Sequence, residues 1–131
     1  MAAQVLVVAF GGRVFGLDPQ SGGHIWRHEM DLVGQNNLVR LAVDGDRVYA
    51  MIYDQLECLD QATGSRIWRA EVGSACDTLL VAGDLVYAAG AGTLRAFRRD
   101  GTLAWSDDFR GQGQGAPALA LAGRVIQADA D

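Results

Sequence analysis

A segment that ends in tryptophan recurs through this chain and constrains its fold more than any other feature. The copies span 17–26, 59–68 and, one residue shorter, 97–105. A glycine lies four residues before each tryptophan, and the tryptophans are 42 and 37 positions apart. Self-similarity with a period of about 40 residues indicates a repeat protein whose units stack on one another. The repeated residues are Trp26, Trp68 and Trp105, with Gly22, Gly64 and Gly101.

Short apolar runs precede the second and third copies and are typical of β-strands. Runs 38–43 and 47–52 are separated by Asp-Gly-Asp, and runs 78–82 and 85–89 by Gly-Asp. Glycine favours tight turns because it adopts positive φ without steric cost. The runs are nearly continuous rather than alternating, as expected of strands covered on both faces. No segment has a convincing helical period, so we predict an all-β fold.

Each repeat divides into four expected strands, named A to D outward from the axis of the assembly. In the second repeat they are 38–43, 47–52, 55–59 and 66–72. The strand-D tryptophan is expected to lie between adjacent units or over the neighbouring turn, and so to lock one repeat to the next. Aspartates beside the turns are expected to bond backbone N–H groups rather than Ca²⁺. They are Asp18 and Asp60 in the Trp segments, and Asp44, Asp46 and Asp84 between strands A and B.

The pattern Leu/Phe–Asp–x–x–Thr/Ser–Gly–x–x–x–Trp, preceded by Val-Tyr-Ala, resembles the PQQ-like β-propeller repeat. The resemblance covers essentially the whole chain. It implies a β-propeller of four-stranded blades, in a family that contains both quinoprotein dehydrogenases and non-enzymatic propellers. The third copy departs from the pattern, because the basic pair Arg98-Arg99 replaces the usual Asp and the turn is shorter.

The strand count predicts about three blades in one domain, 1–131. Blade 1 covers about 4–37, blade 2 about 38–76 and blade 3 about 77–116, with closing strands at 117–131. Blade 1 begins with a B-like strand, and an open arc of this kind exposes strand edges. We therefore expect closure by oligomerisation, most simply a homodimer of about six blades. A different chain that supplies the missing blades remains an alternative, as does a fragment of a larger protein.

Composition restricts the partners. The net charge is −5 and the basic residues are scattered, which argues against nucleic acid binding. No apolar run is long enough for a transmembrane helix, so we expect no membrane partner. The N-terminus lacks a basic segment and a processing site, which predicts a cytoplasmic protein, or a periplasmic one if the chain is a mature form.

No arrangement of residues in the sequence predicts catalysis, and we expect no catalytic residue, cofactor or metal. Cys58 and Cys76 are expected to be unpaired thiols, with at least Cys58 packed as a small apolar residue. The resemblance implies adjacent cysteines near the quinone in the enzymes, and this chain has no such pair. His24 and His28 flank Trp26 at two-residue steps and are expected to share its face as structural residues.

Departures from repetition are the better guide to function, because a scaffold repeats whereas a site usually does not. The connections between strands D and A differ most, and loops on a rigid scaffold are where binding usually resides. The predicted function is a non-catalytic scaffold or interaction module that binds a protein or small ligand through its loop face. The alternative is a quinoprotein-related enzyme subunit or a sugar- or small-ligand-binding propeller. Candidate binding residues are Gln35, Asn36, Asn37, Arg40, Asp77, Arg110, Gln112 and Gln114.

Overall fold

Antiparallel hairpins build the whole of the described chain. The computed structural model describes residues 4–31, 38–73, 76, 78–90, 92–109, 118–122 and 124–127. These residues form thirteen strands and no helix, and accordingly none of them belongs to a helix that could cross a membrane.

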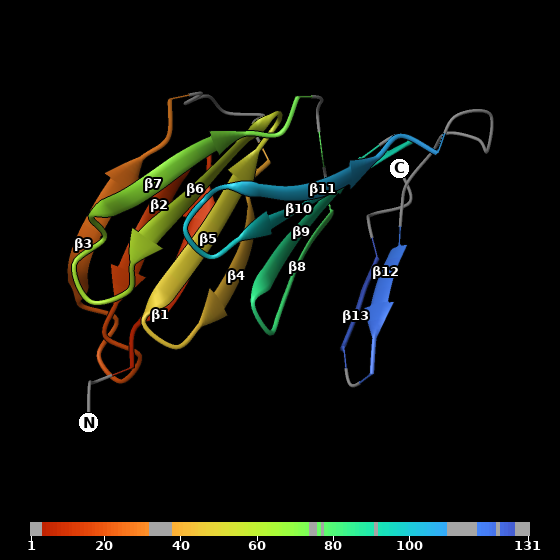
Figure 1. Ribbon diagram of the computed structural model, residues 1–131. Coiled ribbons are helices and arrows are strands. Elements are labelled where there is room, and N and C mark those ends of the chain that lie inside the picture. The colour runs from red at the N-terminus through yellow and green to blue at the C-terminus, as the bar shows by residue number, and fades with distance from the viewer. Residues whose placement is uncertain are drawn as a thin grey trace.

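Each sheet joins strands that follow one another along the chain (Figure 1). Blade 1 has three strands, β1 (Leu6–Phe10), β2 (Arg13–Leu17) and β3 (His24–Glu29). Blade 2 has four, β4 (Arg40–Asp44), β5 (Arg47–Ile52), β6 (Gln55–Asp60) and β7 (Arg66–Glu71). Blade 3 has β8 (Thr78–Ala82), β9 (Leu85–Gly90), β10 (Thr93–Arg98) and β11 (Leu103–Asp107). A final hairpin pairs β12 (Ala118–Leu121) with β13 (Arg124–Gln127).

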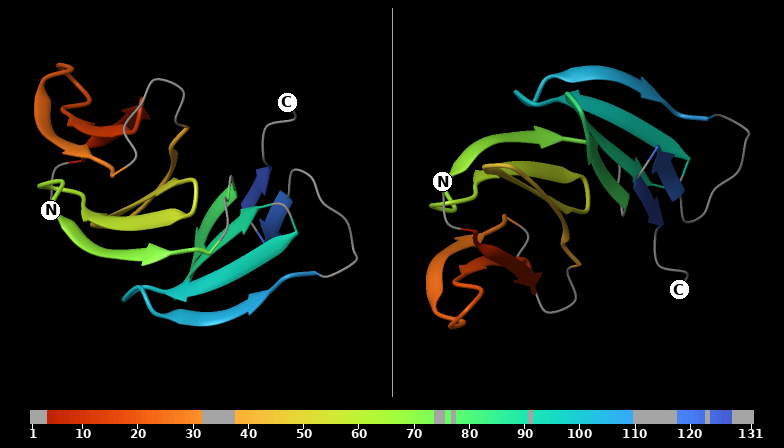
Figure 2. Two further views of the ribbon diagram at one scale, coloured as in Figure 1. Left: turned by 90° about the horizontal axis from the view of Figure 1, so that it is seen from above. Right: turned by 90° about the horizontal axis from the view of Figure 1, so that it is seen from below.

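The blades stack face to face in an arc that does not close (Figure 2). The first strands of blades 2 and 3, β4 and β8, contact each other on the inner side, whereas β7 and β11 form the outer rim. The β12–β13 hairpin follows at the far side of blade 3 and contacts β8. The predicted all-β fold, a partial propeller of about three blades, is therefore confirmed.

Two hydrophobic cores lie between the blades, and β5 contributes to both. Val48, Ala50 and Ile52 belong to the core shared with blade 1, and Tyr49 and Met51 to the core shared with blade 3. Successive residues of a strand point to opposite faces, and both faces of β5 pack against a neighbouring blade, so its residues facing either way are apolar. This explains the continuous apolar run at 48–52, after Arg47.

The aspartates of the Trp segments act as predicted. Asp18 accepts a hydrogen bond from the backbone N–H of Gln20 at 2.9 Å, and Asp60 accepts one from that of Ala62 at 2.8 Å. Both carboxylates thereby fix the turn between strands C and D. Asp44 differs from its expected role, because its carboxylate pairs with Arg99 across the gap between blades.

Candidate functional site

The seam between blades 1 and 2 is closed by Trp26 of β3. Its indole N–H donates a hydrogen bond of 2.8 Å to the carbonyl oxygen of Gln61 in the next blade. The ring lies between Gly16 of its own blade and Gly64 of the following one, and a β-carbon at either position would overlap it. Only glycine allows this close approach. The sequence identified Gly64, but it gave no repeated signal for Gly16.

The seam between blades 2 and 3 uses the same device. The indole N–H of Trp68 donates to the carbonyl oxygen of Arg99 at 2.7 Å, and its ring lies against Gly101. The ring of Tyr49 also contacts the indole, with ring centroids 6.1 Å apart. The predicted lock between repeats is therefore present at both seams, as contact between a tryptophan and the turn of the following blade.

Trp105 repeats the position but not the contact. It lies on β11, and 44% of its surface is exposed, compared with 8% for Trp26. Among the described residues, no turn of a following blade covers it. The expectation that each tryptophan locks its repeat to the next therefore holds for Trp26 and Trp68 at the two seams and not for Trp105.

Arg99 adds a clamp to the second seam that the repeat pattern did not predict. Its guanidinium pairs with Asp44 and donates to the hydroxyl of Tyr49 at 3.1 Å, both in blade 2, and to the carbonyl oxygen of Gly83 at 3.0 Å in blade 3. Partial burial acts to lower the pKa of Arg99, but the hydrogen bonds to Asp44 and Tyr49 outweigh it and raise the pKa. The signal in the sequence was that Arg99 breaks the repeat.

A buried carboxylate occupies the first seam. Glu57 of β6 is fully buried, and its Oε1 lies 2.8 Å from Nε2 of His28 on β3 and 3.8 Å from a guanidinium nitrogen of Arg66. The equivalent positions of the second seam hold Arg95 and Ala70. This contact is therefore one that the scaffold does not repeat.

The expectation that both histidines share the face of Trp26 is wrong for His24. A register shift pairs Gly16 with Trp26 and Leu17 with His24, leaving Ile25 as the extra residue of a β-bulge. His24 consequently lies against Phe15, with ring centroids 5.8 Å apart, on the face opposite Trp26.

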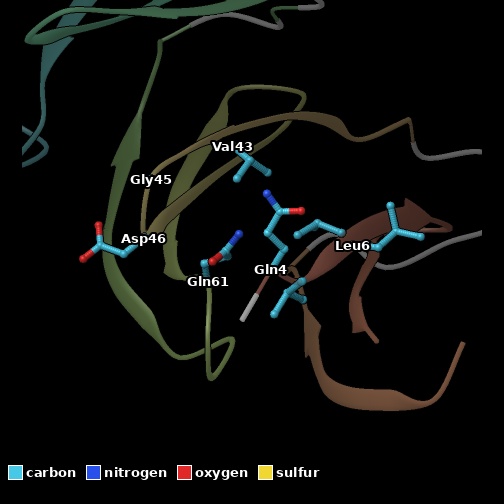
Figure 3. A pocket seen from close by; sticks show the side chains of 8 residues that line it. Gln4, Leu6, Val43, Gly45, Asp46 and Gln61 are labelled. Carbon is cyan, nitrogen blue, oxygen red and sulfur yellow. The ribbon is translucent and has the colours of Figure 1, made fainter. Parts of the chain in front are cut away.

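An open pocket of about 590 Å³ lies beside β1, at the inner edge of blade 1 (Figure 3). Gln4 and Leu6 line one side, and Val43, Asp46 and Gln61 of blade 2 line the other. The lining of the pocket therefore combines amide and carboxylate groups with apolar side chains. Pockets of this size and mixed lining are typical of small-molecule sites, although those are usually more enclosed.

Most of the predicted binding residues fall outside the described part of the chain, so their prediction stays open. They are Gln35, Asn36, Asn37, Asp77, Arg110, Gln112 and Gln114. Arg40 begins β4 and is partly buried. It pairs in register with Met51 of β5.

The residues of this structure do not fit a quinone–metal site. Cys58 and Cys76 are buried and form no disulfide, and burial raises the pKa of Cys58 to about 11. A thiol with so high a pKa is a poor ligand at neutral pH. Within the described residues, no three His, Cys, Asp or Glu side chains cluster to hold a metal ion. We therefore assign no step of chemistry to such a group.

Comparison with known proteins agrees with the fold. A family model of PQQ-like repeats, described as outer membrane protein assembly factor BamB, matches residues 10–130. The chain belongs to this family. Among curated proteins, a sequence search finds no significant match.

Two solved structures show the same fold. BamB from Moraxella catarrhalis superposes with a TM-score of 0.67 at 17% identity, over 96% of this chain and 44% of that one. The quinohemoprotein alcohol dehydrogenase ADHIIG from Pseudomonas putida HK5 gives a TM-score of 0.63 at 19% identity, over 89% of this chain and 20% of that one. This member of the family thus spans less than half the length of either structure.

Proposed function

We propose that this chain is a non-catalytic propeller module that binds another protein at the open inner edge of blade 1. The observation that carries the proposal is β1 itself. It ends the sheet order β1-β2-β3, and its Leu6 and Phe10 are 53% and 64% exposed. An apolar edge strand is a template for pairing with another chain, and natural proteins normally protect such edges.

The roles of the charged and polar side chains support a scaffold rather than an enzyme. Asp18 and Asp60 hold turns, and Asp44 and Glu57 are engaged across the two seams. The first two groups are committed to turns within a blade, and the last two to contacts between blades. The family description as an outer membrane assembly factor also favours binding to other proteins, whereas the dehydrogenase neighbour keeps an enzyme-associated role as the alternative.

The partner that we propose first is a second copy of the chain, in a homodimer of about six blades. Two copies related by a two-fold axis satisfy both open ends of both arcs at once. A different chain that supplies the missing blades is the other candidate. A second function, binding of a small ligand, is favoured by the pocket between Gln4 and Asp46.

Sedimentation equilibrium at micromolar concentration tests this proposal. We expect a dimer for the unmodified chain and weaker association for Leu6→Lys and Phe10→Lys, because charge on an edge strand opposes pairing. Ile25→Lys is the matched control, since Ile25 is 51% exposed but lies on β3, the strand farthest from the inner edge. A well-folded monomer, or an equal effect of all three lysines, contradicts binding of a second copy at β1.

A further inference from the structure

Trp105 is held in the same way as Trp68, but no turn covers it among the described residues. The rings of Tyr87 and Trp105 lie 6.1 Å apart at 57°, and those of Tyr49 and Trp68 lie 6.1 Å apart at 50°. The tyrosine of the second strand therefore orients both indoles alike. Trp105 therefore has the orientation of a seam tryptophan, but the turn that would contact it is not among the described residues.

The turn of blade 1 has the opposite property, because it is a preformed acceptor with no tryptophan on it. Gly22 has a φ of +75° and Gly64 one of +74°. In each turn the glycine N–H donates to the aspartate carbonyl oxygen at 2.8 Å, and the aspartate N–H donates to the residue after the glycine at 2.8 Å. A β-carbon at Gly64 would collide with Trp26, whereas one at Gly22 would meet nothing within 4 Å.

We propose that Trp105 of one copy docks on the Asp18–Gly23 turn of a second copy, as Trp26 docks on the Asp60–Ser65 turn within one chain. The ring would cover Gly22, and the indole N–H would donate to the carbonyl oxygen of Pro19, the residue in phase with Gln61. This inference rests on the proposed function and specifies the contact by which the second copy is recognised.

The Asp18–Gly23 turn belongs to blade 1 and Trp105 to blade 3, and blade 2 lies between them, so a single chain cannot join them (Figure 2). Two copies related by a two-fold axis make the contact twice and close the ring. The docked turn brings β1 of the partner next to β12. In the free chain β13 pairs with β12. Docking would therefore replace β13 with β1 of the partner as the neighbour of β12.

Two substitutions test the contact, one on each half. Trp105→Ala removes the ring, and Gly22→Ala puts a methyl group where the ring must lie. We expect each to raise the dimer dissociation constant in sedimentation equilibrium at least about tenfold, as for a central tryptophan of an interface. Gly83→Ala is the control for backbone strain, because Gly83 has a φ of +58° and also meets nothing within 4 Å. Its dissociation constant should stay that of the unmodified chain.

Mixing the two variants gives a sharper test. Each variant alone loses both contacts of its dimer, whereas a mixed dimer retains one, between Trp105 of the Gly22→Ala chain and Gly22 of the Trp105→Ala chain. The mixture should therefore associate more tightly than either variant alone. Equal association of mixture and components, with both variants folded by circular dichroism, overturns the contact between Trp105 and the Asp18–Gly23 turn.

The result also separates this inference from the proposed function. A monomeric unmodified chain rejects both the second copy as partner and the Trp105 contact. A dimer that Leu6→Lys weakens but Trp105→Ala and Gly22→Ala leave unchanged rejects the Trp105 contact alone.

Discussion

His28 and Glu57 join blades 1 and 2 through a contact that the other seam does not have. Nε2 of His28 lies 2.8 Å from one oxygen of a carboxylate that solvent does not reach. The other oxygen, Oε2, is also buried and has no hydrogen-bond partner within the described residues. Removing the histidine would leave a buried acid with a single distant guanidinium, and buried charges that lose a partner are strongly destabilising.

We expect His28→Ala to lower the free energy of unfolding by about 1–3 kcal/mol, the range for an unsatisfied buried polar group. Urea unfolding followed by circular dichroism measures it. His24→Ala is the control, because His24 is exposed and its ring lies against that of Phe15. Equal losses in the two variants would show that the Glu57 contact contributes nothing.

Trp68→Ala is expected to destabilise the chain by about 3 kcal/mol, the low end of the range for truncation of a core aromatic residue, because Trp68 is partly buried. It removes the ring over Gly101 together with the hydrogen bond to Arg99. Trp105→Ala should cost clearly less at concentrations where the chain is monomeric, because its ring is already half exposed. Thermal or urea unfolding of both variants checks this. A similar loss in each would contradict the assignment of Trp105 as an unfilled position.

Gly64→Ala should be more damaging than Gly45→Ala. Both glycines have positive φ, +74° and +60°, so both variants carry the strain of about 1–2 kcal/mol that a side chain meets there. Only at Gly64 would the new methyl group also displace Trp26. The difference between the two unfolding free energies therefore isolates the packing at the first seam, and a difference near zero would mean that the turn moves freely away from the ring.

Stability should fall in alkaline solution because of Cys58. Burial raises the pKa of this thiol from 9.0 to about 11. The unfolded chain therefore releases the proton first, so the stabilisation is complete below pH 9 and is lost as the pH rises toward 11, by at most about 1.4 kcal/mol per pH unit. Urea unfolding at pH 8 and 10 should show a smaller decline for Cys58→Ala than for the unmodified chain. Parallel declines would remove Cys58 as the cause.

Titration of the purified chain with PQQ and Ca²⁺, followed by absorbance and by heat, should be flat. Cys58 and Cys76 are buried and form no disulfide, and no three metal-ligating side chains cluster among the described residues. Stoichiometric binding at micromolar concentration would overturn the scaffold proposal and favour the enzyme-related alternative.

Sequence periodicity predicted the strands and the pairing of tryptophan with a following turn, because both depend on contacts that recur every repeat. It did not predict the Arg99 clamp or the contact between His28 and Glu57, since each depends on how two particular blades meet. It did not predict the role of Gly16 either, because this residue leaves room for the ring of Trp26 only once β2 pairs with β3. The prediction that both histidines share the face of Trp26 assumed simple alternation along the strand. The bulge at Ile25 breaks that alternation and places His24 on the opposite face.

The direction of the tryptophan contacts has a consequence for synthesis on the ribosome. Trp26 precedes its acceptor Gln61 by 35 residues, and Trp68 precedes Arg99 by 31. At a synthesis rate of about 5–20 residues per second, the turn that covers each indole is made roughly 2–7 s after the tryptophan itself. The most recently made blade of a nascent chain therefore always carries an uncovered aromatic ring, and it is that blade which a chaperone would need to shield.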